Sequence, residues 1–202
     1  MPYHSTMLPQ YEFMGAGNPP MKLEDWKGLR VRALGGLGDA MKKLGAIPTT
    51  VPAPEVYTAL ERGMVQAASF PFAYAHGAYR LHEVSNWHTS NMALGTVGCL
   101  YIFGTQPWEA LPDEYRQILL DAKPAGYDAL KKAYKAGDDE YLPEFRERGL
   151  VAITYSDEEI ERFREVAGRP VWNAWVEEME QKGVPGRELL DFVLATAQKA
   201  GT

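Results

Sequence analysis

Three observations predict an α/β fold for this chain of 202 residues. Nineteen glycines and fourteen prolines are too many for a plain helical bundle. An apolar share of 46% is typical of a globular chain that buries a core. Most directly, strand and helix patterns alternate between residues 29 and 69, which is the order of a parallel sheet with right-handed crossovers.

The first half of the chain supplies the elements of this sheet. A glycine-rich turn at residues 35–38 follows the first strand, and Pro54 suits the first turn of a helix. The predicted elements are a helical lead-in at 23–27, strands at 29–33, 47–51 and 65–69, and helices at 39–44 and 54–63.

The second half of the chain is mainly helical. A Ser156–Glu159 capping box opens one of its helices, and Pro185–Gly186 opens the last. The predicted elements are a helix at 71–79, a β-rich stretch at 84–103, a long helix at 112–149 kinked near Pro124 and Gly126, a strand at 151–153, and two helices separated by a break at 168–170.

Composition excludes several classes of function. The net charge of −6 and the dispersed lysines and arginines argue against nucleic-acid binding, and no apolar run is long enough to cross a bilayer. One cysteine excludes a disulfide framework and a cysteine-based zinc site. His76, His82 and His88 lie six residues apart, a spacing that predicts no metal site, and Cys99 in an apolar strand predicts a buried, inert thiol. We therefore expect no metal and no cofactor.

The glycine turn raises the alternative of a small nucleotide-dependent oxidoreductase. A dinucleotide fingerprint requires a third glycine for close helix packing, and Met41 stands at that position. The next strand also ends without an acidic residue, at Val51–Pro52. A simpler anion site at the helix N-terminus survives this test, because it needs only free N–H groups and a helix dipole.

Arg32 is the most informative single residue. It shares one side of its strand with Arg30, and it stands at the carboxyl end of that strand, where α/β folds open their clefts. A guanidinium there could grip a ligand carboxylate through two parallel hydrogen bonds, or it could pair with an internal Asp or Glu. Likewise, Ser69, Phe70 and Phe72 at the end of the third strand could line a cleft or pack against the following helix.

Five segments of the chain together match one family pattern, and the most specific of them is PEVYTALERG at residues 54–63. The other segments, in the same order as in the family, are DWKGLRVR at 25–32, KLGAIP at 43–48, VQAASFP at 65–71 and LPDEYR at 111–116. From about Tyr11 to the C-terminus, the chain thereby resembles the DctP-type solute receptors of tripartite ATP-independent periplasmic (TRAP) transporters.

The resemblance implies a type II periplasmic-binding-protein-like fold that closes on an organic acid without catalysing a reaction. It implies a parallel-rich sheet flanked by helices, a long bracing helix and C-terminal helices. The implied parts are a first-lobe remnant at 1–10, a ligand-binding lobe at 11–92, a hinge strand and bracing helix at 93–149, and a C-terminal segment at 150–202. Arg32 matches the arginine that clamps the ligand carboxylate, and Phe13, Gly35, Ser69, Phe70 and Phe72 are the implied pocket residues.

Two departures from the family pattern shape the expected ligand and the expected assembly. Apolar residues replace the usual acidic and amide residues before Phe70, and Phe13 is not cationic, so a monocarboxylate with an apolar body is favoured over a C4-dicarboxylate. Family members are longer and begin with a secretion signal, so we expect a periplasmic chain that lacks part of the first lobe. The implied partners are TRAP permease subunits and a second copy of the chain; the alternative is a fragment that self-associates without binding ligand.

Overall fold

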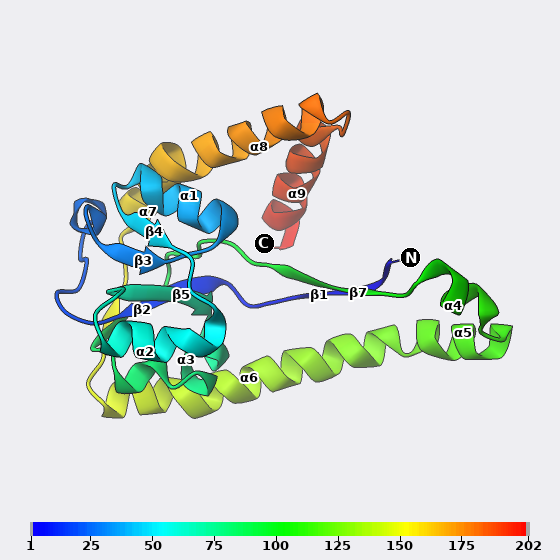
Figure 1. Ribbon diagram of the computed structural model, residues 1–202, viewed down its shortest axis with the longest axis horizontal. Helices are drawn as coiled ribbons and strands as arrows, with labels where there is room; N and C mark the ends of the chain where they lie inside the picture. Colours follow the sequence, from blue (N-terminus) through cyan, green and yellow to red (C-terminus); the bar gives the residue numbers. More distant parts are fainter. Residues whose placement is uncertain (1, 201–202) are drawn as a thin grey trace. The chain divides into compact units, whose positions relative to one another are not determined.

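The computed structural model describes residues 2–200, which divide into two compact units (Figure 1). Unit 1 comprises the residues up to Pro19 together with Val51–Thr154. Unit 2 comprises Pro20–Thr50 and the residues from Tyr155 onward. The predicted division into lobes concerns a whole receptor and stays a prediction.

Unit 1 contains most of the strands and the long helix. Its strands are β1 (Pro2–Met7), β2 (Tyr11–Gly15), β5 (Ala67–Pro71), β6 (Trp87–Thr89), β7 (Gly98–Ile102) and β8 (Val151–Ile153). Its helices are η2 (Ala53–Glu55), α2 (Val56–Glu61), α3 (Tyr74–Ala78), η3 (Leu81–Glu83), α4 (Thr105–Ala110), α5 (Asp113–Asp121) and α6 (Lys123–Glu147).

Strand β2 organises the sheet of unit 1. It pairs antiparallel with β5 on one side and with β6 on the other, and β6 pairs parallel with β8. In the β2–β5 register Phe13 stands opposite Ser69, and Glu12 stands opposite Phe70. The side chains of a strand point alternately to its two faces, so each of these cross-strand pairs lies on one face of the sheet.

The core of unit 1 forms where α2, α3 and the last turns of α6 pack on the Met14 and Ala68 face of this sheet. Leu60, Leu81 and Phe145 are buried there. Close approach of α3 to α6 requires glycine, because a Cβ atom at Gly77 would lie 2.2 Å from the ring of Tyr141. Burying these apolar side chains stabilises the unit by about 1.5–3 kcal/mol each.

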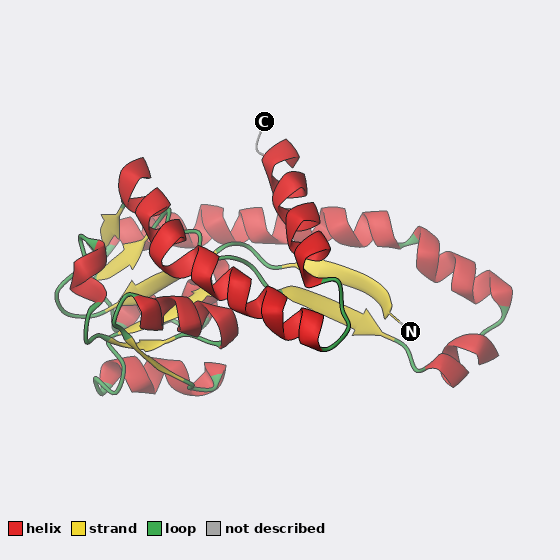
Figure 2. Cartoon of the chain, turned by 90° about the horizontal axis from the view of Figure 1, so that it is seen from above, coloured by secondary structure: helices red, strands yellow, loops and turns green. Residues whose placement is uncertain are grey.

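Strands β1 and β7 form a separate antiparallel ribbon that runs beside α6 (Figures 1 and 2). The hydroxyl groups of Tyr3 and Tyr127 fasten this ribbon to the helices by donating to the carbonyl oxygens of Leu119 and Ser5. All five residues of β7 are exposed.

Unit 2 combines a parallel strand pair with helices from both ends of the sequence. Its elements are η1 (Leu23–Trp26), β3 (Arg30–Arg32), α1 (Gly35–Lys43), β4 (Ile47–Thr49), α7 (Asp157–Phe163), a π-helical turn η4 (Arg164–Gly168), α8 (Arg169–Gln181) and α9 (Gly186–Ala200). The buried indole N–H of Trp26 donates to the hydroxyl of Tyr155 at 3.0 Å, and that hydroxyl donates to the carbonyl of Pro20 at 2.6 Å. These bonds tie the two sequence segments of the unit together.

The structure confirms the α/β class and the parallel pairing of the first two predicted strands. The sheet strands are mixed in direction, because β2 runs antiparallel to both of its neighbours. The predicted N-cap is also confirmed, since the Ser156 hydroxyl accepts from the N–H of Glu159 at 3.2 Å. Among the described residues, no helix has the length and apolar character needed to span a membrane.

Four local predictions are wrong in detail. The glycines at residues 35–38 form the first turn of α1 rather than a turn before it. The third strand lies at Ala67–Pro71 instead of 65–69, because pairing with β2 fixes its ends. The long helix is interrupted at Ala122 rather than kinked, with Pro124 in the first turn of α6, where a missing N–H costs little. Residues 168–170 form no break between two helices, because η4 runs directly into α8. Pro170 lies in the first turn of α8, where a missing N–H again costs little.

Candidate functional site

Arg32 and Gly35 lie at the carboxyl end of β3 in unit 2. The Arg32 side chain is only 5% exposed, whereas Arg30 on the same strand is exposed. Thr49 of β4 stands beside Arg32 in the parallel register. The chain then turns into α1, whose first residue, Gly35, has a φ of +52°, a conformation that glycine adopts without strain. A buried guanidinium therefore stands three residues before the N-terminus of a helix.

Phe13 and Ser69 come together in unit 1. They stand opposite each other across the β2–β5 pair, and both are fully buried. Trp87 of β6 joins them, because it pairs with Gly15 and its ring occupies the space that a Cβ atom at Gly15 would need. This face presents two aromatic side chains and one hydroxyl.

Phe70 and Phe72 lie in a different environment from Ser69. Phe70 belongs to the core cluster on the opposite face of β5, and its ring centroid lies 5.1 Å from that of Tyr79. Phe72, just past the strand, packs against the same core, with its ring 5.2 Å from His88. Adjacent positions on the strand thus supply one face with a hydroxyl and the other with apolar rings.

The three histidines gather in unit 1 although their sequence spacing predicts no such grouping. The rings of His82 and His88 lie 5.4 Å and 5.8 Å from that of Phe145, and the ring of His76 lies 5.8 Å from that of Phe72. Burial lowers the pKa of His76 to about 3 and also lowers the pKa of His88. The rings of His76 and His88 are therefore neutral and act as core side chains, whereas the ring of His82 contacts the Glu144 carboxylate at 3.0 Å. The described residues hold no group of three or more His, Cys, Asp or Glu suited to a metal ion.

Glu12 is a buried residue whose role the sequence did not reveal. Its carboxylate accepts hydrogen bonds from the Thr89 hydroxyl at 2.5 Å and from the N–H groups of Met92 and Ala93 at 3.1 Å and 2.7 Å. Burial raises its pKa, and these hydrogen bonds partly oppose that rise. The one available signal was a glutamate inside the apolar segment of residues 11–15, where an exposed charge is not expected.

The prediction that Cys99 is a buried thiol is wrong. The thiol lies in β7 and is exposed, not buried. An apolar strand in a sequence predicts burial only if another element covers it, and the ribbon that contains β7 has exposed residues throughout that strand.

Comparison with known proteins identifies the family. The family model for bacterial extracellular solute-binding proteins, family 7 (DctP), matches residues 11–179. The ectoine-binding periplasmic protein TeaA of Halomonas elongata is 28% identical over an alignment of 200 residues that covers 92% of this chain and 54% of that protein. A monocarboxylate 2-oxoacid-binding periplasmic protein of Nostoc sp. is 27% identical over an alignment of 142 residues that covers 67% of this chain and 38% of that protein.

Solved structures agree with this fold. A TRAP solute-binding protein of Rhodoferax ferrireducens, solved with copurified benzoate, superposes on this chain with a TM-score of 0.85 at 24% identity. The superposition covers 100% of this chain and 65% of the Rhodoferax protein. TeaA in its apo state superposes with a TM-score of 0.76 at 25% identity, over 94% of this chain and 60% of its own. The chain thus spans about half the length of TeaA by sequence and under two thirds of these structures. Because the family model matches most of its length, the chain belongs to bacterial extracellular solute-binding protein family 7.

Proposed function

We propose that this chain captures an organic acid in the periplasm, without covalent chemistry, as the solute receptor of a TRAP-type secondary transporter. The observation that carries this proposal is the burial of Arg32 at the carboxyl end of β3, in a chain whose family binds extracellular solutes. The docking partners are the TRAP permease subunits of the membrane.

The surroundings of Arg32 suit a carboxylate. A guanidinium holds a carboxylate through two parallel N–H···O bonds, and partial burial strengthens each of them. The first N–H groups of α1, beginning at Gly35, have no partner inside the helix and carry the positive end of its dipole. Arg32 and this helix N-terminus together offer donors and positive charge to one anionic group.

The body of the ligand follows from the residues of unit 1 that were predicted to contact it. Phe13 is apolar and Ser69 is neutral, so this set of residues offers no cation to a second carboxylate. Phe72 adds a further apolar ring. We therefore assign a monocarboxylate with an apolar or aromatic body, whose carboxylate is anchored by Arg32, while Phe70 supports its own strand from the core side.

The names of the relatives support a carboxylate ligand without choosing between monocarboxylates and dicarboxylates. One curated relative is named as a monocarboxylate 2-oxoacid-binding protein. Two structural neighbours were solved with benzoate and with mandelate, and a third with malonate, a dicarboxylate. The list of acids spans both kinds, so the choice between them requires an experiment.

A thermal-shift panel makes that choice. Benzoate, mandelate and a 2-oxo monoacid are compared with succinate and malate, each at millimolar concentration. A ligand at 100 times its Kd stabilises the folded chain by about 2.7 kcal/mol, which is a shift of several degrees in Tm. Shifts from the monoacids alone are the expected result. Shifts from succinate and malate alone would overturn the monocarboxylate assignment, and no shift from any acid would overturn carboxylate capture.

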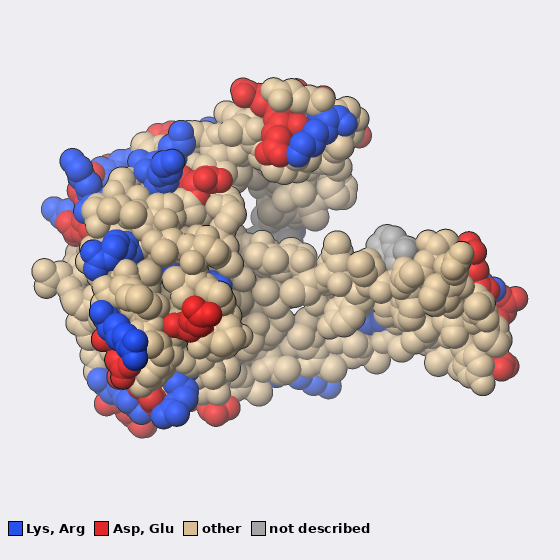
Figure 3. All heavy atoms as spheres, viewed as in Figure 1, with Lys and Arg blue, Asp and Glu red and all other residues tan. Residues whose placement is uncertain are grey.

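The β1–β7 ribbon supports a second proposal, association with another copy of this chain. Leu100 and Ile102 are 67% and 72% exposed, and neither strand contains a charged residue that would oppose contact. Figure 3 shows few charged atoms over this stretch. Two-stranded ribbons are marginal by themselves, and their free edges pair readily with other strands.

The test of this second proposal is the molar mass in solution. Light scattering is expected to give a dimer for the unmodified chain and a monomer for Leu100→Lys. Ile118→Lys, which changes an exposed apolar residue on α5, is the matched control and should remain dimeric. A monomeric unmodified chain would overturn the proposal. A dimer that shows no thermal shift with any acid would instead identify a self-associating chain that does not bind ligand.

A further inference from the structure

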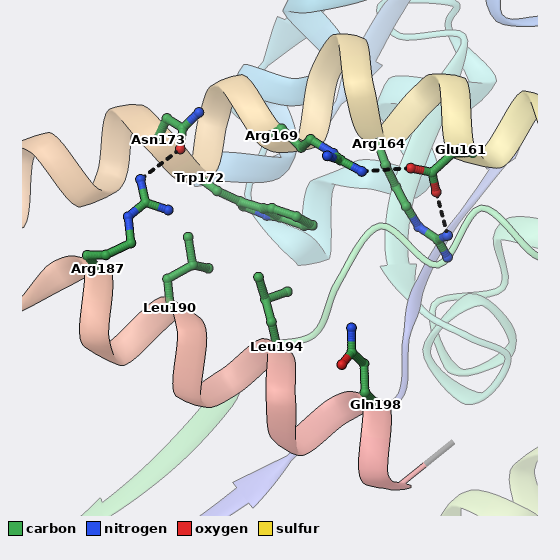
Figure 4. Close-up of a pocket in the computed structure, with 9 residues that line it drawn as sticks. All are labelled: Glu161, Arg164, Arg169, Trp172, Asn173, Arg187, Leu190, Leu194 and Gln198. Carbon is green, nitrogen blue, oxygen red and sulfur yellow. Dashed lines mark hydrogen bonds and ion pairs between the residues drawn. The ribbon is translucent and has the colours of Figure 1, made fainter. Parts of the chain in front are cut away.

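A cavity of about 470 Å³ lies in unit 2 between α8 and α9 (Figure 4). The close contact at one end of this helix pair explains how the cavity forms. A Cβ atom at Gly186 would lie 2.9 Å from the carbonyl oxygen of Val176, so the two helices touch where the chain turns from α8 into α9. They diverge from that point, and the space between them is left open to side chains and solvent (Figure 1).

The polar side chains of this cavity carry an excess of positive charge. Among the described residues, its lining includes Arg164, Arg169 and Arg187 but only a single carboxylate, that of Glu161. Glu161 pairs with Arg164 at 3.1 Å and with Arg169 at 2.8 Å. Three cations against one anion leave a surplus of two positive charges, in a chain whose net charge is −6.

Arg187 is the cation with the most unused capacity for an anion. Its guanidinium donates to the amide oxygen of Asn173 at 3.1 Å, and that amide is neutral. A guanidinium has five N–H donors, so most of those on Arg187 remain for another acceptor. Figure 4 shows Arg187 at one end of the cavity and the Glu161 group at the other.

Between these ends the cavity is apolar. Trp172 of α8 extends its indole ring into the space, facing Leu190 and Leu194 of α9 (Figure 4). The volume falls within the range of pockets that bind small molecules, and such pockets combine apolar walls with a few convergent polar groups. An indole face suits stacking with a flat ring.

We propose that this cavity is a second small-molecule site, separate from Arg32, for an organic anion with a flat apolar body. Arg187 binds the anionic group, held in position by Asn173. Trp172 stacks on the body of the ligand, and Leu190 and Leu194 close the opposite side. The pair of Arg164 and Arg169, only half neutralised by Glu161, disfavours cationic ligands at the far end.

The experiment uses 2-naphthoate as the probe and the indole N–H signal of Trp172 in two-dimensional NMR spectra as the readout. Trp172→Phe assigns that signal, and the signal of Trp175, an exposed tryptophan on α8 outside the cavity, is the internal control. Succinate, which lacks a flat body, and tryptamine, which is a flat cation, are the control compounds. All titrations are carried out on the full chain and repeated with Arg32→Ala, so that binding at Arg32 is counted separately.

The expected result is a saturable shift of the Trp172 signal with 2-naphthoate alone, unchanged in Arg32→Ala. Arg187→Ala should weaken the Kd at least tenfold, and Trp172→Leu should weaken it about fivefold when binding is measured by calorimetry. Lys182→Ala removes a nearby positive charge that does not line the cavity, and it should change the Kd less than twofold. An unmoved Trp172 signal, a shift that disappears in Arg32→Ala, or equal effects of Arg187→Ala and Lys182→Ala would each overturn the proposal.

Discussion

The hydroxyl group of Thr89 connects two strands through Glu12. It donates to the Glu12 carboxylate at 2.5 Å and accepts from the backbone N–H of Phe13 at 2.8 Å. The same carboxylate accepts from two further backbone N–H groups after β6, those of Met92 and Ala93. A buried acid is costly unless its oxygens are hydrogen-bonded, and here they fix the chain segment that leaves the sheet toward the ribbon.

Replacing Glu12 should therefore destabilise the protein strongly. Glu12→Ala leaves the buried N–H of Met92 without its acceptor, at about 1–3 kcal/mol, and it also removes the hydrogen bonds from Ala93 and from the buried hydroxyl of Thr89. We expect the free energy of unfolding in urea to fall by about 2–5 kcal/mol. Glu55→Ala, at an exposed glutamate of η2, should change it by under about 0.5 kcal/mol. An effect of Glu12→Ala as small as that of the control would contradict the role assigned to this carboxylate.

The buried ring of His76 should make the stability of the protein depend on pH. The pKa of His76 is about 3 in the folded chain, against 6.5 as its ordinary value, because burial disfavours the charged ring. Below pH 6.5 the unfolded chain therefore binds a proton that the folded chain does not, so stability is present above this pH and lost as pH falls toward 3. Each pH unit in this window costs up to about 1.4 kcal/mol per histidine.

The variant His76→Phe isolates this contribution, because it keeps a ring against Phe70 and Phe72. Burial raises the pKa of Glu12, so above pH 4.5 this residue lowers stability as the pH rises, opposite to the effect of His76. Glu12 is present in both proteins, so its contribution cancels when their pH profiles are compared. Urea denaturation between pH 4 and pH 8 should give a smaller loss of stability on acidification in His76→Phe than in the unmodified chain. Parallel curves for the two proteins would show that His76 does not titrate on unfolding.

Two glycines on helices should respond oppositely to the same substitution. Gly77→Ala places a methyl group within 2.4 Å of the Tyr141 ring, so α3 and α6 must move apart, at about 1–3 kcal/mol. Gly126→Ala on α6 meets nothing within 4 Å, and it should stabilise the helix by up to about 1 kcal/mol. Thermal unfolding measures both changes. An equal loss of Tm in the two variants would contradict the packing described for α3 and α6.

The exposed thiol of Cys99 should react in the folded protein. In the Leu100→Lys chain, which is expected to be monomeric, an aromatic disulfide reagent should modify one thiol per chain to the same extent with and without denaturant, since the sequence contains one cysteine and the structure exposes it. Modification that appears only after denaturation would show that another surface covers β7.

Local patterns predicted local structure well. The alternation at Arg30–Arg32 gives β3, and the Ser156 cap begins α7, because strand alternation and capping depend on neighbours along the chain. The strand pairs of β2, the contacts of His82 and His88 with Phe145, and the hydrogen bonds of Glu12 join residues more than 50 positions apart in the sequence. The exposure of Cys99 depends on what covers a strand, which neither its composition nor its period specifies.

The proposed function depends above all on carboxylate binding by Arg32, which calorimetric titration of benzoate or a 2-oxo monoacid measures. Arg30→Ala removes an exposed arginine from the same side of β3 and serves as the matched control. We predict that Arg32→Ala abolishes binding at that site while its circular dichroism spectrum stays unchanged, and that Arg30→Ala binds normally. A folded Arg32→Ala chain that binds the acid as tightly as the unmodified chain would show that Arg32 does not hold the carboxylate.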